Sequence, residues 1–259
     1  MGIFIIAALA IMFIGFLFFK PRSAAKVNVV NQDTDYKPLL LTHIPFYKQL
    51  DDAGRAAFEQ KVVNFLHRVT IEGVGTVIDD TDRVMIAASA VIPIWGFKHW
   101  EYRNLTNVIL YPDTFDGEFQ FEGGNRSIMG MVGSGYMNGQ MILSRAALQK
   151  GFSRSAGREN TAIHEFVHLL DKSDGATDGV PENLLAHEYV LPWIKMMHQE
   201  IYKIEAGKSD INPYATTNEA EFLAVAAEYF FQKPNEFQHK HPQLYEMLSA
   251  MFKQDRAEG

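Results

Sequence analysis

The chain has 259 residues, of which 47% are apolar, and this length suits one large domain with a substantial core. It contains no cysteine, which excludes disulfides, thiolate metal sites and a cysteine nucleophile, so any metal must be held by His, Asp or Glu. The formal net charge is −7 at pH 7. Because an acidic chain is repelled by phosphate backbones, we expect no nucleic-acid partner.

The N-terminal segment, residues 1–19, carries no charged side chain. A bilayer core of about 30 Å needs roughly 20 helical residues, so this segment is predicted to be one transmembrane anchor in the lipid bilayer, with a buried core helix as the alternative. Lys20, Arg22 and Lys26 follow directly. Since positive charges favour the cytoplasmic side, we expect a single-pass membrane protein whose remaining chain is cytoplasmic.

The rest of the chain is predicted to be a polar linker over 20–38 and one domain over 39–259. Apolar spacing predicts helices over 52–69 and 82–94, the second stopped by Pro93. Short apolar or alternating runs predict strands over 107–111 and 140–143, and a hairpin of 117–121 with 127–132 around a turn at 123–125. From Gly157 onward the pattern is helical. Strands grouped early and helices grouped late favour an α+β fold with a helical C-terminal half.

The segment Asn160 to Asp171 reads NTAIHEFVHLLD and contains the pattern H-E-x-x-H at His164, Glu165 and His168. Residues four apart share one helix face, so both imidazoles can reach one ion, and imidazole nitrogen is a common Zn²⁺ ligand. Glu165 would then act as the base for a water molecule that the metal activates. Two ordinary histidines on a helix are the alternative. The surrounding apolar residues favour a buried helix, in which these polar groups need a partner.

A catalytic zinc usually takes a third protein ligand, and several acids are candidates. Asp174 is one, although no glycine stands where a metzincin would turn the chain back toward the metal. Glu221 and Glu228 lie seven apart on one face of a predicted helix, and spacing alone does not choose between them. Asp171 lies on the metal-facing side of its helix. It is expected either to orient a ligand histidine or to pair with Lys or Arg.

The motifs HEFVHLLD from His164, DGVP from Asp178 and AEFLAVAAEYFF from Ala220 resemble the Mlc titration factor A family of zinc-dependent peptidases, over about 41–252. The catalytic core of that family is similar to that of anthrax lethal factor. The resemblance implies a zincin-like domain and places the third zinc ligand at Glu221. It also implies an oxyanion-stabilising phenol at Tyr214, a peptide or protein substrate, and aminopeptidase-like action. The cytosolic members of the family are not known for an N-terminal anchor; with the anchor predicted above, we expect this chain in the bacterial inner membrane.

The predicted activity is therefore zinc-dependent peptide hydrolysis, with Glu165 and Tyr214 as catalytic residues and His164, His168 and Glu221 as ligands of one Zn²⁺. The alternative is a non-catalytic regulatory protein that sequesters a protein partner and keeps a structural or vestigial zinc site. Peptide hydrolysis that depends on Glu165 would discriminate between them.

Overall fold

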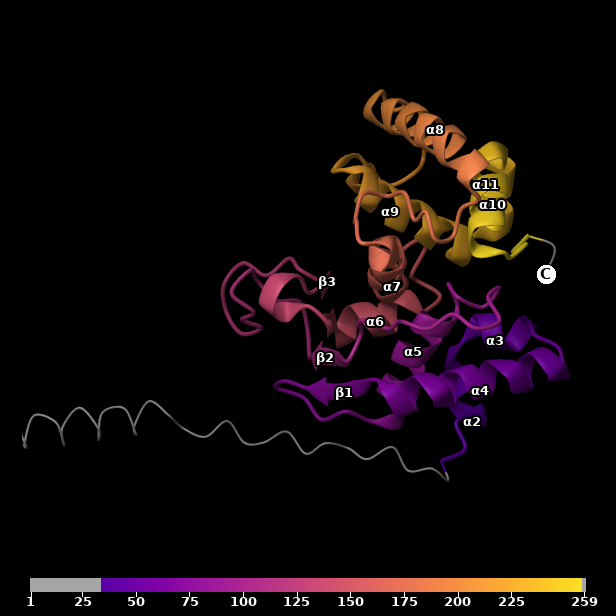
Figure 1. Cartoon of the computed structure of the whole chain (residues 1–259). Coiled ribbons are helices and arrows are strands. Elements are labelled where there is room, and N and C mark those ends of the chain that lie inside the picture. The colour runs from indigo at the N-terminus through magenta and orange to yellow at the C-terminus, as the bar shows by residue number, and fades with distance from the viewer. Residues whose placement is uncertain (1–33, 258–259) are drawn as a thin grey trace, which may run out of the picture.

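The computed structural model describes residues 34–257 and shows a mixed α+β arrangement. In Figure 1 the sheet and the N-terminal helices lie on one side, helices α8 to α11 lie on the other, and α7 lies between them. The strands are β1 (Thr70–Gly73), β2 (Asn107–Tyr111), β3 (Gly130–Val132) and β4 (Gln140–Ser144). The helices are α2 (Lys37–His43), α3 (Pro45–Gln49), α4 (Asp52–Arg68), α5 (Asp80–Val91), α6 (Arg145–Gly151), α7 (Thr161–Asp171), α8 (His187–Glu205), α9 (Glu219–Gln232), α10 (Pro234–Lys240) and α11 (Pro242–Phe252), with short 3₁₀ turns η1 (Gly135–Met137), η2 (Lys172–Asp174) and η3 (Pro213–Thr216).

The sheet has the strand order β1-β2-β4-β3. The first three of these run parallel, and β3 pairs antiparallel with β4 at the edge, with Met131 opposite Ile142. Alternation along β2 separates two cores. Val108 and Leu110 face the main core beneath the helices, whereas Ile109 and Tyr111 face a small second cluster.

The predicted combination of a small mixed sheet and a helical C-terminal half is confirmed. The predicted strands over 107–111 and 140–143 correspond to β2 and β4, and the predicted helices over 52–69 and 82–94 to α4 and α5. β1 is an additional strand, which is too short and too polar to produce a clear pattern.

The predicted hairpin of 117–121 with 127–132 is wrong. Residues 117–121 form no strand, and the segment holds only one isolated bridge, between Phe115 and Ile128. The Asp116 carboxylate accepts the N–H groups of Glu118 and Gln120, which closes a local turn. The alternation that suggested a strand comes instead from aromatic side chains of this loop that cover the second cluster.

The predicted membrane localisation requires a correction. Within residues 34–257 no helix combines the length and apolar character needed to cross a bilayer. The predicted anchor, residues 1–19, lies outside the described residues. The structure therefore gives no support to a single-pass membrane protein, and that assignment is withdrawn.

Candidate metal centre

Helix α7 carries the H-E-x-x-H pattern and runs through the middle of the protein. Its first turn is capped by Asn160, whose side-chain oxygen accepts the N–H of Ile163 at 3.1 Å. The helix packs against α5, α6, α9 and β3, so most of its surface is buried. His164 and Glu165 are only 8% and 6% exposed. Polar side chains are thus held inside an apolar environment, where they need specific partners.

Helix α9 brings Glu221 to the two histidines of α7. Its start is fixed by Asn218, whose side chain accepts the N–H of Glu221 at 2.9 Å. Glu221 Oε2 lies 2.9 Å from His164 Nε2 and 3.5 Å from His168 Nε2, and the two Nε2 atoms are 3.0 Å apart. Three donor atoms from two helices therefore converge, and His164, His168 and Glu221 together could hold a metal ion. We call these three residues the metal-binding group.

The separations of these three atoms allow hydrogen bonds and are also compatible with donors around one metal ion. Donors about 2.0–2.1 Å from a tetrahedral Zn²⁺ are roughly 3.4 Å from one another, which is close to the observed separations. His164 Nδ1 lies 2.7 Å from the carboxylate of Glu228, and this contact assigns the ring hydrogen to Nδ1. In the neutral ring with this tautomer, Nε2 of His164 would direct its lone pair toward the shared centre, as a metal ligand requires.

Glu228 is the residue of this site whose role the sequence left open. It is 7% exposed, and its carboxylate contacts His164 Nδ1 while also accepting the backbone N–H of Asn160. It thus orients the ring of His164 and satisfies a donor at the start of α7. The signal in the sequence was its place in the apolar run AVAAEYFF, where a solvent-facing glutamate is not expected.

The electrostatics of the group favour a positive charge at its centre. Burial lowers the pKa of His164, but hydrogen bonds with Glu221 and Glu228 outweigh this effect and raise the pKa to about 10. Burial likewise raises the pKa of Glu221, but its hydrogen bonds with His164 and His168 bring the pKa down to about 2. Glu221 is therefore an anion at neutral pH, and a cation between these side chains would be stabilised.

Glu165 lies beside the group, under the edge strand β3. Burial raises the pKa of Glu165, and the neighbouring histidines oppose this rise. Gly130 of β3 passes so close that a Cβ atom at that position would be 2.7 Å from Glu165 Oε1 and 2.9 Å from Thr161 Cγ2. Beyond Gly130, the Lys172 ammonium donates to the carbonyl of Gly133 at 3.1 Å. Gly130 of the edge strand therefore contacts the first half of α7, and Gly133, which follows the strand, is bonded to Lys172, which follows α7.

Tyr214 lies in η3, directly before α9, with its ring centroid 6.1 Å from that of His164. The ring is 54% exposed, and no hydrogen bond of its hydroxyl is found among residues 34–257. Partial desolvation, followed by the carboxylates of Glu221 and Glu165, raises the pKa of Tyr214. The phenol is therefore protonated at neutral pH and free to donate.

The other acidic candidates lie outside the metal-binding group. Asp174 belongs to a loop, where its carboxylate accepts the N–H groups of Ala176 and Glu182 at 3.1 and 2.8 Å. Among residues 34–257, Asp171 has no histidine, Lys or Arg partner: its Oδ2 accepts the N–H of Gly179 at 2.9 Å, and its buried Oδ1 has no hydrogen-bond partner. Within the described part of the chain, His168 Nδ1 has no hydrogen-bond partner, so only His164 has an orienting carboxylate.

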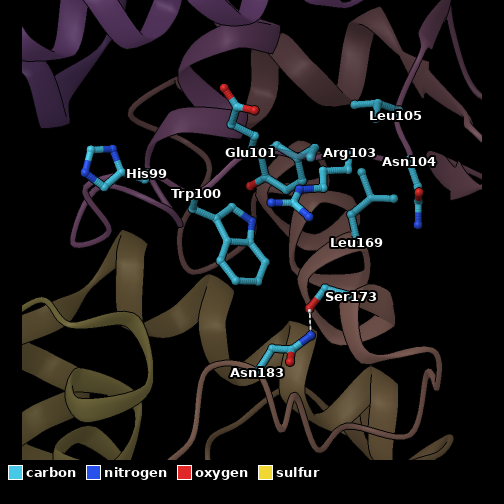
Figure 2. A pocket seen from close by; sticks show the side chains of 10 residues that line it. His99, Trp100, Glu101, Arg103, Asn104, Leu105, Leu169, Ser173 and Asn183 are labelled. Carbon is cyan, nitrogen blue, oxygen red and sulfur yellow. Dashed lines mark hydrogen bonds between the residues drawn. The ribbon is translucent and has the colours of Figure 1, made fainter.

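Two of the cavities are relevant to this site. One cavity, of about 520 Å³, is lined by Glu228, Arg158 and Pro213 among other residues. It adjoins the metal centre because Glu228 contacts His164. The other, of about 320 Å³, is shown in Figure 2 near the C-terminal end of α7, where Leu169, Ser173 and the segment 99–105 line it. No residue of the metal-binding group lines this second cavity.

Comparison with known proteins agrees with this geometry. The family described as glucose-regulated metallo-peptidase M90 matches residues 19–253. An uncharacterized protein of Synechocystis is 31% identical over 84% of this chain and 82% of its own. Proteins named Mlc titration factor A from Serratia proteamaculans and Salmonella arizonae are 28% and 27% identical, over 70% and 89% of this chain and 72% and 95% of theirs.

The expected similarity of the core to anthrax lethal factor stays a prediction. The family match covers most of the chain, including every residue of the metal-binding group. The chain belongs to the glucose-regulated metallo-peptidase M90 family, together with the enterobacterial proteins named Mlc titration factor A.

Proposed function

We propose that this protein is a zinc-dependent peptidase with His164, His168 and Glu221 as the metal ligands, Glu165 as the general base and Tyr214 as an oxyanion donor. The observation that supports this most directly is the convergence of three donor atoms beside a buried glutamate. Two imidazoles and one carboxylate form a donor set typical of catalytic zinc, and the chain has no thiolate to offer. Zinc held there would polarise a carbonyl group and make a water molecule more acidic.

The residues around the metal-binding group supply the remaining chemistry. Glu165 is placed to accept a proton from the attacking water and to return it to the leaving amine. Tyr214 can donate a hydrogen bond to the oxygen that becomes negatively charged as the carbonyl is attacked. Its position on η3, before the helix that carries Glu221, places it on the exposed side of the group.

The edge strand β3 offers a way to align a peptide. The Ser144 N–H donates to the carbonyl of Met129, and the Gly133 N–H donates to the carbonyl of Gln140. In this antiparallel register, the backbone groups directed at β4 are those of Met129, Met131 and Gly133. By alternation, Gly130 and Val132 turn their N–H and C=O groups away from the sheet. An extended peptide can pair with this edge beside Glu165, which favours an unfolded segment or a chain end as substrate.

The names of several relatives favour a second candidate, a protein that binds a regulatory partner without hydrolysing it. The discriminating experiment measures metal content and hydrolysis of a peptide library by the full chain and by Glu165→Gln. We expect near-stoichiometric zinc in both proteins and a loss of about 10²- to 10⁴-fold in turnover for the variant. Hydrolysis by Glu165→Gln at the parental rate would show that the assigned base is wrong.

The ligand set is tested separately by competition with a chelator. Glu221→Ala should lose zinc affinity sharply, because it removes one of three ligands. Asp174→Ala should retain it, because the Asp174 carboxylate bonds to backbone N–H groups of its own loop. The reverse result would assign the third ligand to Asp174.

A further inference from the structure

The loop between α7 and α8 is held at Gly179 by two buried side chains. The Gly179 N–H donates to Asp171 Oδ2 at 2.9 Å, and the Gly179 carbonyl accepts from Trp193 Nε1 at 2.6 Å. Asp171 is 1% exposed and Trp193 is fully buried. The end of the histidine-bearing helix and the start of α8 therefore fix this one residue from both sides.

Gly179 in turn lies directly against the first turn of α9. Its φ is +76°, a conformation that suits glycine, and a Cβ there would be 2.2 Å from the carbonyl oxygen of Glu219 and 3.1 Å from the nitrogen of Ala220. This contact falls one and two residues before Glu221. On the other side of Glu221, the ring of Phe222 packs 6.0 Å from that of Trp193.

We propose that Asp171 and Trp193 are positioning residues of the metal centre, which hold Gly179 against α9 and thereby set the distance between Glu221 and the two histidines. The inference rests on the proposed metal site. The histidines belong to α7 and the glutamate to α9, so the separation of the three donor atoms depends on how these two helices are joined. The path from Asp171 through Gly179 to Glu219 is a short, buried connection between them.

The remainder of the loop is fastened independently of this path. The Asp174 carboxylate accepts the N–H of Glu182, and the Asn183 amide donates to the Ser173 hydroxyl at 3.4 Å (Figure 2). These bonds close the loop on itself and reach no residue of α9. Loss of the Gly179 contacts should therefore alter the placement of Glu221 without unfolding the loop.

The test measures zinc affinity by chelator competition, together with the visible spectrum of the Co²⁺-substituted full chain, which reports ligand geometry. The variants are Gly179→Ala, Trp193→Phe, Asp171→Ala and Asp171→Asn. The asparagine oxygen can still accept the Gly179 N–H, so Asp171→Asn should keep nearly parental affinity. The other three should bind zinc about 10-fold more weakly or worse, with an altered cobalt spectrum and an unchanged far-UV circular dichroism spectrum.

Gly96→Ala is the matched control. A Cβ at Gly96 would be 2.3 Å from the carbonyl oxygen of Lys253, so this substitution imposes a similar backbone collision on residues that do not belong to the metal centre. It should lower stability and leave zinc affinity unchanged. If Gly179→Ala does not fold, Trp193→Phe and the two Asp171 variants decide the question.

Two results would contradict the proposal. Parental affinity and cobalt spectrum in folded Trp193→Phe and Asp171→Ala would show that the Gly179 contacts do not position Glu221. Equal losses in Asp171→Asn and Asp171→Ala would show that Asp171 acts through its charge and not by accepting the Gly179 N–H. A parent protein that binds no zinc would instead contradict the proposed function itself, so the two failures are distinguishable.

Discussion

The carboxylate of Glu228 contacts Nδ1 of His164 at 2.7 Å and also accepts the backbone N–H of Asn160, directly before the helix that carries this histidine. One side chain therefore links the orientation of a metal ligand to the start of α7. Because both contacts are buried, neither can be replaced by water without a rearrangement.

Glu228→Ala should weaken zinc binding by about 10- to 100-fold, because His164 loses the partner that fixes its ring and tautomer. It should also lower the free energy of unfolding by about 1–3 kcal/mol, since the Asn160 N–H is left without an acceptor. Chelator competition and urea unfolding measure the two effects. Glu219→Gln, an exposed change on the same helix, is the control, and equal zinc affinity in both variants would contradict the assigned role.

Tyr214→Phe should lower kcat by about 10²- to 10³-fold with little change in KM, because the hydroxyl is proposed to act on charge that develops only in the transition state. Zinc affinity should be unchanged, since Tyr214 is not one of the three ligands. Steady-state kinetics on a peptide substrate and metal analysis test this. A parental kcat would leave the tyrosine with a packing role alone.

Gly130→Ala should displace the Glu165 carboxylate and leave the zinc content unchanged. The new Cβ would be 2.7 Å from Glu165 Oε1 and 2.8 Å from its Cγ, so the carboxylate must move. A displacement of about 1 Å can reduce turnover by about 100-fold, and we expect a loss of that order in kcat with normal zinc content. Gly117→Ala, where the added methyl group meets nothing within 4 Å, should behave like the parent.

His241 should give the protein a pH-dependent stability above neutrality. Its Nε2 lies 2.7 Å from Asp210 Oδ1, and its Nδ1 lies 3.7 Å from Glu200 Oε2. Burial lowers the pKa of His241, but the carboxylates of Glu200 and Asp210 raise it by more, so the net shift is upward from 6.5. The cations nearby pair with the same acids: Arg158 and Lys240 with Asp210, and Lys203 with Glu200.

Because the folded-state pKa is higher than the unfolded one, this stabilisation is complete below about pH 6.5 and is lost as pH rises through the folded-state value. The acids of the cluster have lowered pKa values and stay ionised over this range. Relative to His241→Gln, the parent should therefore lose stability as pH rises above 6.5. Urea unfolding of metal-free protein measures the difference, with the exposed His239→Gln as control; a constant difference would contradict the assignment.

The sequence predicted the part of the site that depends on one helix. His164, Glu165 and His168 share a face because of helical spacing alone, and the apolar residues between them predicted burial. The partner acids required a contact between two helices, which periodicity does not specify. For Glu221 the family resemblance gave the position; its backbone N–H is bonded to the side chain of Asn218, which caps α9.

The fold was predictable where elements were long or strongly apolar, as with α4 and β2. It was not predictable in the segment 112–129. Apolar and polar residues alternate both along a strand and along a loop that covers an apolar cluster, so the sequence pattern does not distinguish the two. Asp171 shows a similar limit. Helical spacing placed it on the metal side of α7, but its hydrogen bond to Gly179 depends on the path of a loop that no periodic pattern describes.

The edge strand β3 contacts α7 at Gly130, which lies against Glu165 and Thr161, and Gly133, directly after β3, accepts from Lys172, directly after α7. A strand fastened in this way should move together with α7 and not as an independent flap. A peptide that pairs with this edge, as proposed, would therefore meet a fixed strand. Selection among peptides should then favour extended segments with small side chains. Hydrogen exchange of the β3 amides should be coupled to that of the α7 amides.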